Sequence, residues 1–371
     1  MQEKNLSVKK LLLSAAFAAV AAPSFAQTNV TVSGLIDNYV GTMHMAGESD
    51  RRAVLNSGGM TTSWIGFKGT EDLGGGLKAN FALTSFIQAD NGVYGRFTGD
   101  TLFSRDAHVG LAGSFGSVSL GRDLAPNFLP TILFNPFGDS FQFSPLILQA
   151  DVPVAFNSTA RTGWTNSLAG DTGWSNEILY TTPNFGGLTA NVHYQFGEVA
   201  GDTGKRNFGA NVLYFGGPLA LTAFYHNVKV NNPLAAPPGN VQPGPNSFTF
   251  DLPSGLEAAR QTAWMVGGSY DLTAVKLFAT YGRTTHDIDL SDKTLSLGAS
   301  VPVGGGKVLA AWAQTRRDGA AFGDEAKRNT ASVGYDYDLS KRTDVYAIYM
   351  NDRITDQDSG NSFGVGIRHR F

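Results

Sequence analysis

The sequence predicts an all-β chain that closes into a transmembrane barrel of about sixteen antiparallel strands. Apolar and polar residues alternate with a period of two through most of the chain, which is typical of strands with one apolar and one polar face. The chain is 42% hydrophobic and only 16% charged. Beyond the N-terminus, however, it has no run of about 20 apolar residues, the length that a membrane helix needs. A barrel reconciles these observations, because only alternate residues of its strands face lipid.

Residues 1–26 have the three parts of a secretory signal peptide. Three lysines lie among the first ten residues, an apolar run follows at 11–22, and small residues precede Gln27. The apolar run is too short to span a membrane. We therefore expect export, cleavage before Gln27, and a mature chain 27–371 that forms one barrel domain. Removing the segment takes away three lysines and one glutamate, so the net charge changes from −3 to −5.

Composition and motifs exclude several function classes. An acidic mature chain without a basic stripe argues against a nucleic-acid partner. The chain has no cysteine, which excludes disulfides, thiolate metal sites and a catalytic thiol. Its six histidines are scattered, with no pair at metal-ligand spacing. We therefore expect no metal, no cofactor and no catalytic residues.

The alternation is clearest at 188–197, 293–301 and 361–371. Their polar faces consist mainly of Gly, Ser, Thr and Asn, whereas a soluble sheet would expose Lys and Glu. Such a polar face suits a water-filled lumen. The expected strands are 29–42, 60–70, 76–88, 102–113, 117–122, 174–182, 188–197, 206–216, 218–229, 260–271, 274–286, 293–303, 306–317, 328–338, 342–353 and 361–371.

The connections between these strands alternate in length. Short Gly- and Pro-containing turns alternate with long polar loops, which include 43–60, 229–260 and 318–327. Outer-membrane barrels have short periplasmic turns and long extracellular loops. An even number of strands brings both termini to the periplasmic side and leaves no strand edge unpaired.

Four stretches resemble the general porins of Gram-negative bacteria, most closely those of the beta-proteobacteria. They are 66–77 (GFKGTEDLGGGL), 118–122 (VSLGR), 180–187 (YTTPNFGG) and 364–371 (GVGIRHRF). The resemblance covers essentially the whole mature chain, and its specificity comes from the combination of the four stretches.

The resemblance implies a homotrimer of 16-stranded barrels surrounded by outer-membrane lipids, each with a long third loop folded into the lumen. The implied function is passive diffusion of ions and small hydrophilic solutes. In this family a terminal phenylalanine, here Phe371, addresses the chain to the barrel-assembly machinery.

The expected third loop covers about 123–173. Five prolines interrupt any strand there, and many phenylalanines and leucines make the segment too apolar for disorder. A loop of this length usually has a function. We expect an inward-folded constriction; a packed surface loop or a subunit contact is the alternative.

By resemblance, Asp139 matches the acidic tip of the porin third loop, although a second acid usual at the tip is missing. Arg105 and Arg122 match two members of the arginine ladder on the opposite wall. The third position holds Trp64, with Lys68 on the same strand face. The neighbouring charged or titratable residues complete the expected constriction: they are Asp106, Asp123 and His108.

Opposite charges across a narrow aqueous gap create a transverse field that aligns water and dipolar solutes. With Trp64 in place of arginine, we expect a weaker field, a modest anion preference and passage of aromatic acids. Alternatively, Trp64 only packs on the phenylalanine-rich loop. His108 could also make the conductance pH-sensitive.

Other functions remain open for the whole chain. They are an outer-membrane lipase or protease with a site assembled from distant strands, an adhesin, or a gated uptake channel.

Overall fold

The computed structural model describes residues 29–96, 100–150, 171–198, 200–204, 206–230, 260–287, 289–319 and 326–371. The expected signal peptide 1–26 lies outside the described residues. So do residues 151–170 of the expected third loop and most of the expected loop 229–260.

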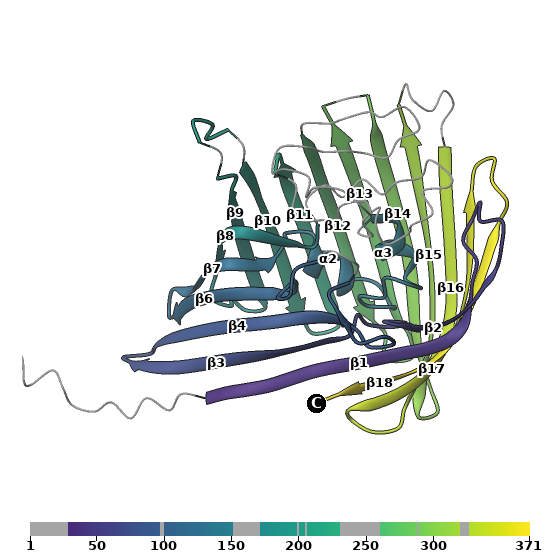
Figure 1. The fold of residues 1–371 in the computed structure, drawn as a ribbon, viewed down its shortest axis with the longest axis horizontal. Coiled ribbons are helices and arrows are strands. Elements are labelled where there is room, and N and C mark those ends of the chain that lie inside the picture. The colour runs from purple at the N-terminus through teal and green to yellow at the C-terminus, as the bar shows by residue number, and fades with distance from the viewer. Residues whose placement is uncertain are drawn as a thin grey trace, which may run out of the picture.

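The described chain is a sheet of antiparallel strands (Figure 1). The strands are β1 (Asn29–Met43), β2 (Arg52–Ser57), β3 (Trp64–Gly74), β4 (Leu77–Gln88), β5 (Val93–Tyr94), β6 (Asp106–Gly113), β7 (Gly116–Leu124), β8 (Gly173–Thr181), β9 (Leu188–Phe196), β10 (Arg206–Gly216), β11 (Leu219–Val228), β12 (Gln261–Asp271), β13 (Lys276–His286), β14 (Ser291–Val303), β15 (Gly306–Asp318), β16 (Ala326–Asp338), β17 (Thr343–Ile354) and β18 (Gly360–Arg370).

The sheet closes on itself, because β1 pairs with β18 on one side and with β2 and β3 on the other. β3 pairs with residues 29–35 of β1, and β2 pairs with residues 38–43. The two strands therefore occupy one position in the ring, and the two-residue β5 only extends the edge of β4. The ring consequently has sixteen strand positions, which confirms the predicted barrel.

Two features differ from the sequence prediction. The expected loop 43–60 contains β2, whose mixed polar sequence RAVLNS gave little sign of a strand. The chain also forms two short helices, α2 (Phe128–Ile132) and α3 (Pro145–Ala150), in the expected third loop. Five or six residues are too few to show a helical period. No helix in the described part of the chain is long and apolar enough to cross a membrane.

Each strand has a polar inner face and an apolar outer face, as β16 illustrates. Arg328, Thr330 and Ser332 are buried inside the barrel, whereas Val333 and Tyr337 are exposed on the outside. The short turns also lie at one rim, where Phe371 exchanges two backbone hydrogen bonds with Gly34. The predicted alternation along the strands is therefore confirmed.

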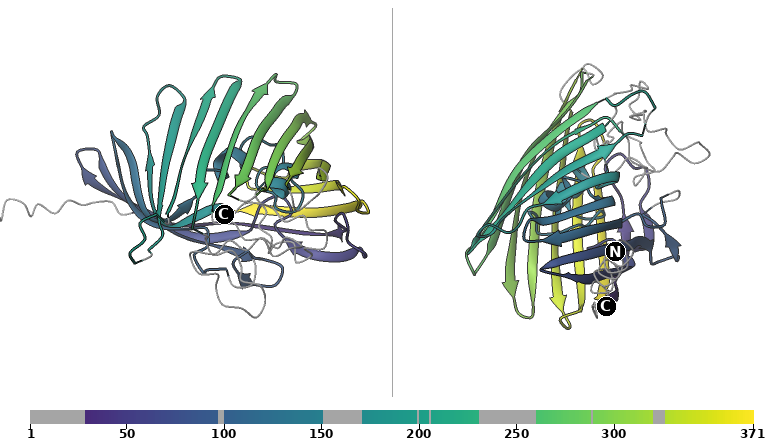
Figure 2. Two further views of the ribbon diagram at one scale, coloured as in Figure 1. Left: turned by 90° about the horizontal axis from the view of Figure 1, so that it is seen from above. Right: turned by 90° about the vertical axis from the view of Figure 1, so that its left-hand side faces the viewer.

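The segment 125–150, which contains α2 and α3, packs on the polar face of the wall. Ser332 donates a hydrogen bond to the Phe143 carbonyl (2.7 Å), and Asn211 donates one to the Pro126 carbonyl (2.9 Å). Gln149 donates to the Ala313 carbonyl and to the Thr330 hydroxyl. Both helices lie within the curve of the sheet (Figure 2).

Wall glycines leave room for this segment. A Cβ atom at Gly298 would lie 2.5 Å from Cδ of Pro136, and one at Gly364 would lie 2.8 Å from the ring of Phe143. Side chains at these positions would push the segment away from the wall, because packed interiors tolerate little added volume.

Gly298→Val should displace Pro136 and the turn that follows it. Overpacking of this kind costs about 1–3 kcal/mol. We expect a lower unfolding temperature in detergent and a changed single-channel conductance. The matched control is Ala299→Val, which adds volume on the lipid-facing side of the same strand. Equal behaviour of the two variants would show that Pro136 does not depend on this contact.

Candidate functional site

Three strands bring a charged cluster together on the inner wall. Trp64 and Lys68 lie on β3, Thr84 on β4, and Arg105 and Asp106 at the start of β6. One oxygen of Asp106 accepts hydrogen bonds from Arg105 (2.9 Å) and Thr84 (2.8 Å) and lies 3.6 Å from the Lys68 ammonium. The Asp106 carboxylate therefore holds two cations in place.

Trp64 stacks on one of these cations. The Arg105 guanidinium carbon lies 4.2 Å from the centre of the Trp64 ring, a cation–π distance. The aromatic ring thus supports the Arg105 guanidinium. The Lys68 and Arg105 side chains are 47% and 22% exposed, whereas the Asp106 side chain is 6% exposed. The positive ends of the cluster reach water, and its carboxylate does not.

Asp139 lies in a turn that the segment itself builds. The Asn135 side chain accepts a hydrogen bond from the Phe137 amide and donates one to the Gly138 carbonyl. Ser140 then donates to the Gly59 carbonyl on the wall (2.6 Å). Burial raises the pKa of Asp139, while the charges of Arg368 and Arg105 act in the opposite direction. The Asp139 carboxyl group also has a hydrogen bond with Thr61, which lowers the pKa, and Thr61 in turn accepts a hydrogen bond from Arg368 (2.8 Å).

Arg368 on β18 is a member of this site that the sequence analysis missed. Its guanidinium donates to Asp344 (3.0 Å), to Asp336 (3.4 Å) and to the Thr61 hydroxyl (2.8 Å). The available signal was its place on the polar side of the alternation at 361–371. What the sequence could not show is the register of the closing pair and the hydrogen bond from Arg368 to Thr61, a residue in the connection between β2 and β3.

Arg122 has a different environment from the one expected. It is only 7% exposed and donates hydrogen bonds to the Ser104 and Gly173 carbonyls. It also forms an ion pair with Asp171 (3.4 Å). The expectation that Arg122 presents its charge on an open channel wall is therefore not met. The Arg122 guanidinium instead links the start of the expected third loop to its end, through Asp171 and the Gly173 carbonyl.

The same buried network contains Arg96, which the sequence analysis also missed. Arg96 pairs with Asp171 (2.7 Å) and with Asp100 (2.9 Å). Burial alone would lower the pKa of Arg96, but the two carboxylates raise it. For Asp171, burial opposes ionisation, yet the charge of Arg96 and its hydrogen bonds hold the pKa below the usual value. Both groups therefore stay ionised and tie the loop before β6 to the start of β8.

His108 and Asp123 lie together on the side of the short turns. Their side chains are 3.0 Å apart, and both line a cavity of about 370 Å³ together with Leu129 of α2. Ser119 also donates a hydrogen bond to Asp123 (2.9 Å). These two residues are close to each other, as expected, but they face a space below the segment 125–150.

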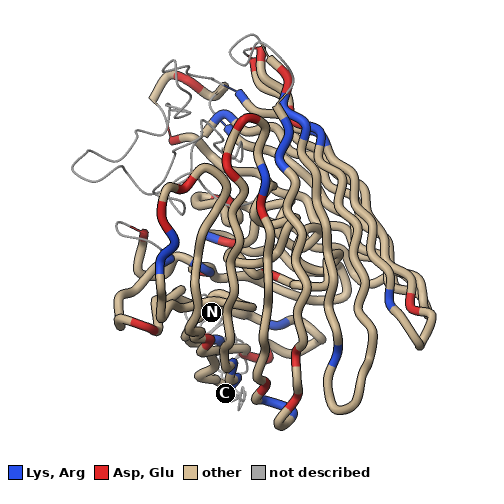
Figure 3. The backbone as a smooth tube through the Cα atoms, turned by 90° about the vertical axis from the view of Figure 1, so that its right-hand side faces the viewer, with Lys and Arg blue, Asp and Glu red and all other residues tan. Residues whose placement is uncertain are grey.

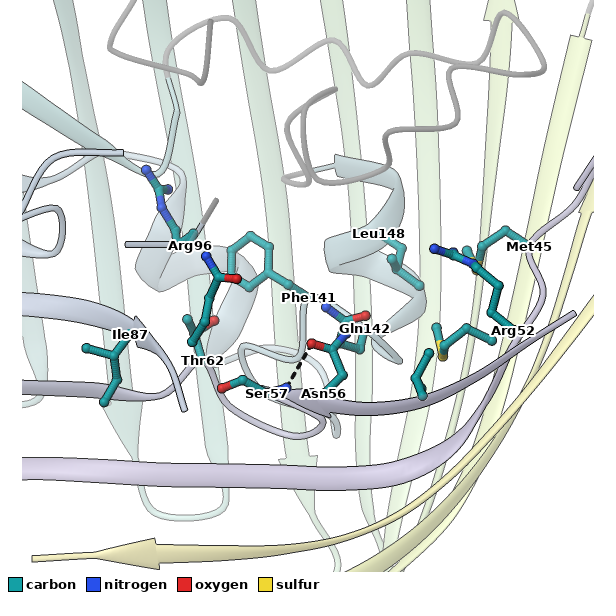
Figure 4. A pocket seen from close by; sticks show the side chains of 14 residues that line it. Met45, Arg52, Asn56, Ser57, Thr62, Ile87, Arg96, Phe141, Gln142 and Leu148 are labelled. Carbon is teal, nitrogen blue, oxygen red and sulfur yellow. Dashed lines mark hydrogen bonds between the residues drawn. The ribbon is translucent and has the colours of Figure 1, made fainter. Parts of the chain in front are cut away.

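A second cavity, of about 210 Å³, lies nearer the long loops (Figure 4). Phe141, Gln142 and Leu148 of the segment line it on one side, and Arg52, Asn56 and Thr62 line it on the wall side. The segment 125–150 thus borders an aqueous space on each of its two sides. Within the described residues, no group of three or more His, Asp or Glu side chains could hold a metal ion.

The chain is similar to known outer-membrane proteins. The profile of the family described as Gram-negative porin matches residues 13–357. Outer membrane porin protein 32 of Delftia acidovorans is 33% identical over 91% of this chain and 88% of its own length. An outer membrane porin protein of Bordetella pertussis is 30% identical over 98% of this chain and its own full length.

A solved structure is also similar. The anion-selective porin from Comamonas acidovorans is 27% identical and superposes with a TM-score of 0.71. The similarity covers 93% of this chain and all of that one.

Arg96→Gln should destabilise the barrel, because it removes one charge from a buried network and leaves Asp100 without its guanidinium. Breaking such a pair costs on the order of 3 kcal/mol. Since the pKa of Asp171 is lowered, its contribution to stability is fully present above the ordinary Asp value and is lost progressively as the pH falls from that value through the lowered pKa of the folded state.

Unfolding temperatures of the wild type and of Arg96→Gln, measured between pH 7 and pH 3, would test this contribution of Asp171 to stability. We expect the advantage of the wild type over Arg96→Gln to begin to decrease at the acid end. The exposed Arg51→Gln is a matched control and should change little. A constant difference between Arg96→Gln and the wild type across this pH range would contradict the role of Asp171.

Proposed function

The chain belongs to the Gram-negative porins and forms a channel for passive diffusion across the outer membrane; on that premise, we propose that the segment 125–150 sets its narrowest part. The observation that carries this proposal is the hydrogen bond between Asp139 and Thr61, a wall-side residue that also accepts a hydrogen bond from Arg368 (2.8 Å). Opposite charges across an aqueous gap order water and favour polar solutes over apolar ones.

We propose that the constriction prefers anions, because its cations are more exposed than its carboxylates. The side chains of Lys68 and Arg105 are 47% and 22% exposed. The side chain of their partner Asp106 is only 6% exposed. A passing ion therefore meets the positive ends of this cluster rather than its carboxylate. The similar porin from Comamonas acidovorans is described as anion-selective, which supports the same preference.

The double substitution Lys68→Gln and Arg105→Gln should shift the channel toward cations. The reversal potential across a salt gradient in a planar bilayer measures this preference. We expect the wild type to favour chloride and the variant to lose most of that preference. Lys341→Gln with Arg342→Gln, in an exposed turn at the rim, removes the same charge and should have little effect. A clear cation preference of the wild type would refute the proposal.

Asp139 should make the selectivity depend on pH. Because burial raises its pKa, Asp139 takes up a proton at a higher pH than an ordinary aspartate. The constriction then loses one negative charge, so the anion preference should increase as the pH falls from 7 toward 4. In Asp139→Asn this increase should be absent, and the variant should match the acid form of the wild type. A persistent increase in Asp139→Asn would contradict this role of Asp139.

We also propose that Trp64 favours the passage of aromatic acids through the channel. Its ring and the neighbouring Arg105 together offer an apolar face and a positive charge. Trp64→Arg should reduce the flux of an aromatic acid such as benzoate relative to an aliphatic acid of similar size. Liposome flux assays would measure the ratio of the two rates. Equal ratios in wild type and variant would mean that Trp64 only supports Arg105.

Further proposals concern export and assembly. We propose that residues 1–26 are removed on export, that Phe371 addresses the chain to the barrel-assembly machinery, and that the protein is a homotrimer without catalytic activity. The exposed side chain of Phe371, at the closing seam of the barrel, supports its role as an address. The relatives named above are porins, which supports passive transport.

A further inference from the structure

The cavity of about 210 Å³ beside the segment 125–150 has a largely apolar lining. We call it the loop-side cavity. Met43, Met45 and Val54 of the hairpin formed by β1 and β2 line one part of it. Phe141 and Leu148 line it from the segment, as Figure 4 shows. Except for Val54, these side chains are at most 6% exposed. An apolar lining within a concave space is typical of sites for small organic ligands.

Arg52 on β2 brings a positive charge to this cavity. Its side chain is 51% exposed, and Nη2 donates a hydrogen bond to Glu48 (3.1 Å). The Glu48 side chain is 1% exposed and also accepts a hydrogen bond from the Met45 amide (2.9 Å). Because a guanidinium has several N–H donors, the bond to Glu48 leaves Arg52 able to bind a second carboxylate. The cation therefore reaches water, whereas its carboxylate partner is enclosed.

The lining as a whole favours an anion. Among the described residues that line the loop-side cavity, Arg52 and Arg96 are charged and none has a carboxylate. Arg96 is already paired with Asp100 and Asp171, so Arg52 supplies the exposed charge. The cavity of about 370 Å³ below the segment differs, because Asp123 lines it and is 13% exposed. Figure 3 shows both acidic and basic residues at the upper rim, so the rim has no single sign of charge, whereas the loop-side cavity does.

The size of the loop-side cavity selects a small ligand. An apolar cavity of about 150 Å³ in another protein holds one benzene ring. The loop-side cavity, at about 210 Å³, has room for one ring and one carboxylate. Sites for drug-sized ligands are larger, at about 300–1,000 Å³. Gln142 and Thr62 also line the cavity and add neutral hydrogen-bond donors.

We propose that the loop-side cavity binds a single-ring aromatic carboxylate, of which benzoate is the simplest. The ring lies among Met43, Met45 and Phe141, where thioether sulfur packs favourably against an aromatic ring. The carboxylate binds the Arg52 guanidinium through charge-assisted hydrogen bonds. Long loops of outer-membrane barrels face outward, so an entering solute meets this site before it passes the segment 125–150. The site is separate from the preference proposed for Trp64, which is not among the lining residues.

NMR spectroscopy of the methionine methyl groups tests the proposal on the purified protein in neutral detergent. Met43 and Met45 line the loop-side cavity, whereas Met265 on β12 lines a separate cavity of about 40 Å³. Benzoate should shift the signals of Met43 and Met45 in a saturable way and leave the signal of Met265 unchanged. Acetate lacks the ring and benzyl alcohol lacks the charge, so each should bind at least about tenfold more weakly than benzoate.

Substitutions separate the charge of the site from its shape. Arg52→Gln should weaken benzoate binding about tenfold, because it removes a hydrogen bond to a charged group. Arg51→Gln is the matched control: it removes the same charge from the adjacent, exposed position outside the lining and should bind like the wild type. Val54→Trp fills the cavity without changing any charge and should abolish binding. Each variant should keep the Met265 signal of the wild type, which reports that the barrel is folded.

Three results would overturn the proposal. The first is that the signals of Met43 and Met45 do not respond to benzoate. The second is equal affinity of the wild type and Arg52→Gln, or of benzoate and benzyl alcohol, which would show that the charge is not used. The third is an equal shift of the Met265 signal, which would assign the response to benzoate in the detergent. Binding is measured at equilibrium and without flux, so failure of the proposed constriction would leave these results unchanged.

Discussion

The pairing of β1 with β18 is the interaction on which the rest of the structure depends. A bilayer offers no water to satisfy free N–H and C=O groups, so a sheet that crosses it must leave no edge unpaired. Closure also explains the two faces of every strand. The outward residues meet lipid and are apolar, and the inward residues meet water and are small or polar. The low charge and high glycine content of the chain follow from this division.

Closure also creates an interior that the chain partly fills. The segment 125–150 is held there at several points: Arg96, Arg122 and Asp171 form a buried network beside its start, and Ser140 attaches its tip to Gly59. Wall glycines provide the space beneath it. A loop fixed at several points keeps Asp139 at a constant place relative to Arg105 and Arg368. Selectivity by fixed charges requires this rigidity, because the field depends on the separation of the charges.

The sequence was sufficient to predict the barrel, because alternation along a strand is a local signal that remains visible in the closed sheet. It was less informative about the contacts of the residues at the constriction. Arg122 and Arg105 both fit a pattern of inward arginines, yet one is buried with Asp171 and the other reaches water. This difference depends on a partner that is 49 residues away from Arg122 in the chain. Arg368 escaped notice for the same reason, since one of its partners, Thr61, is 307 residues away in the chain. The strand β2 and the two short helices lack a periodic signal of sufficient length.

The central claim is that the tip of the segment 125–150 narrows the channel. The chain has no cysteine, so a single Asp139→Cys substitution allows specific labelling of the tip. Single-channel recording should show that a positively charged methanethiosulfonate reagent, added from either side, lowers the current of Asp139→Cys in one step per channel. Asp318→Cys, on the outer face at the rim, should carry an unchanged current after the same treatment. If labelled Asp139→Cys conducts like the unlabelled protein, the tip does not lie in the ion path, and the account of the constriction is wrong.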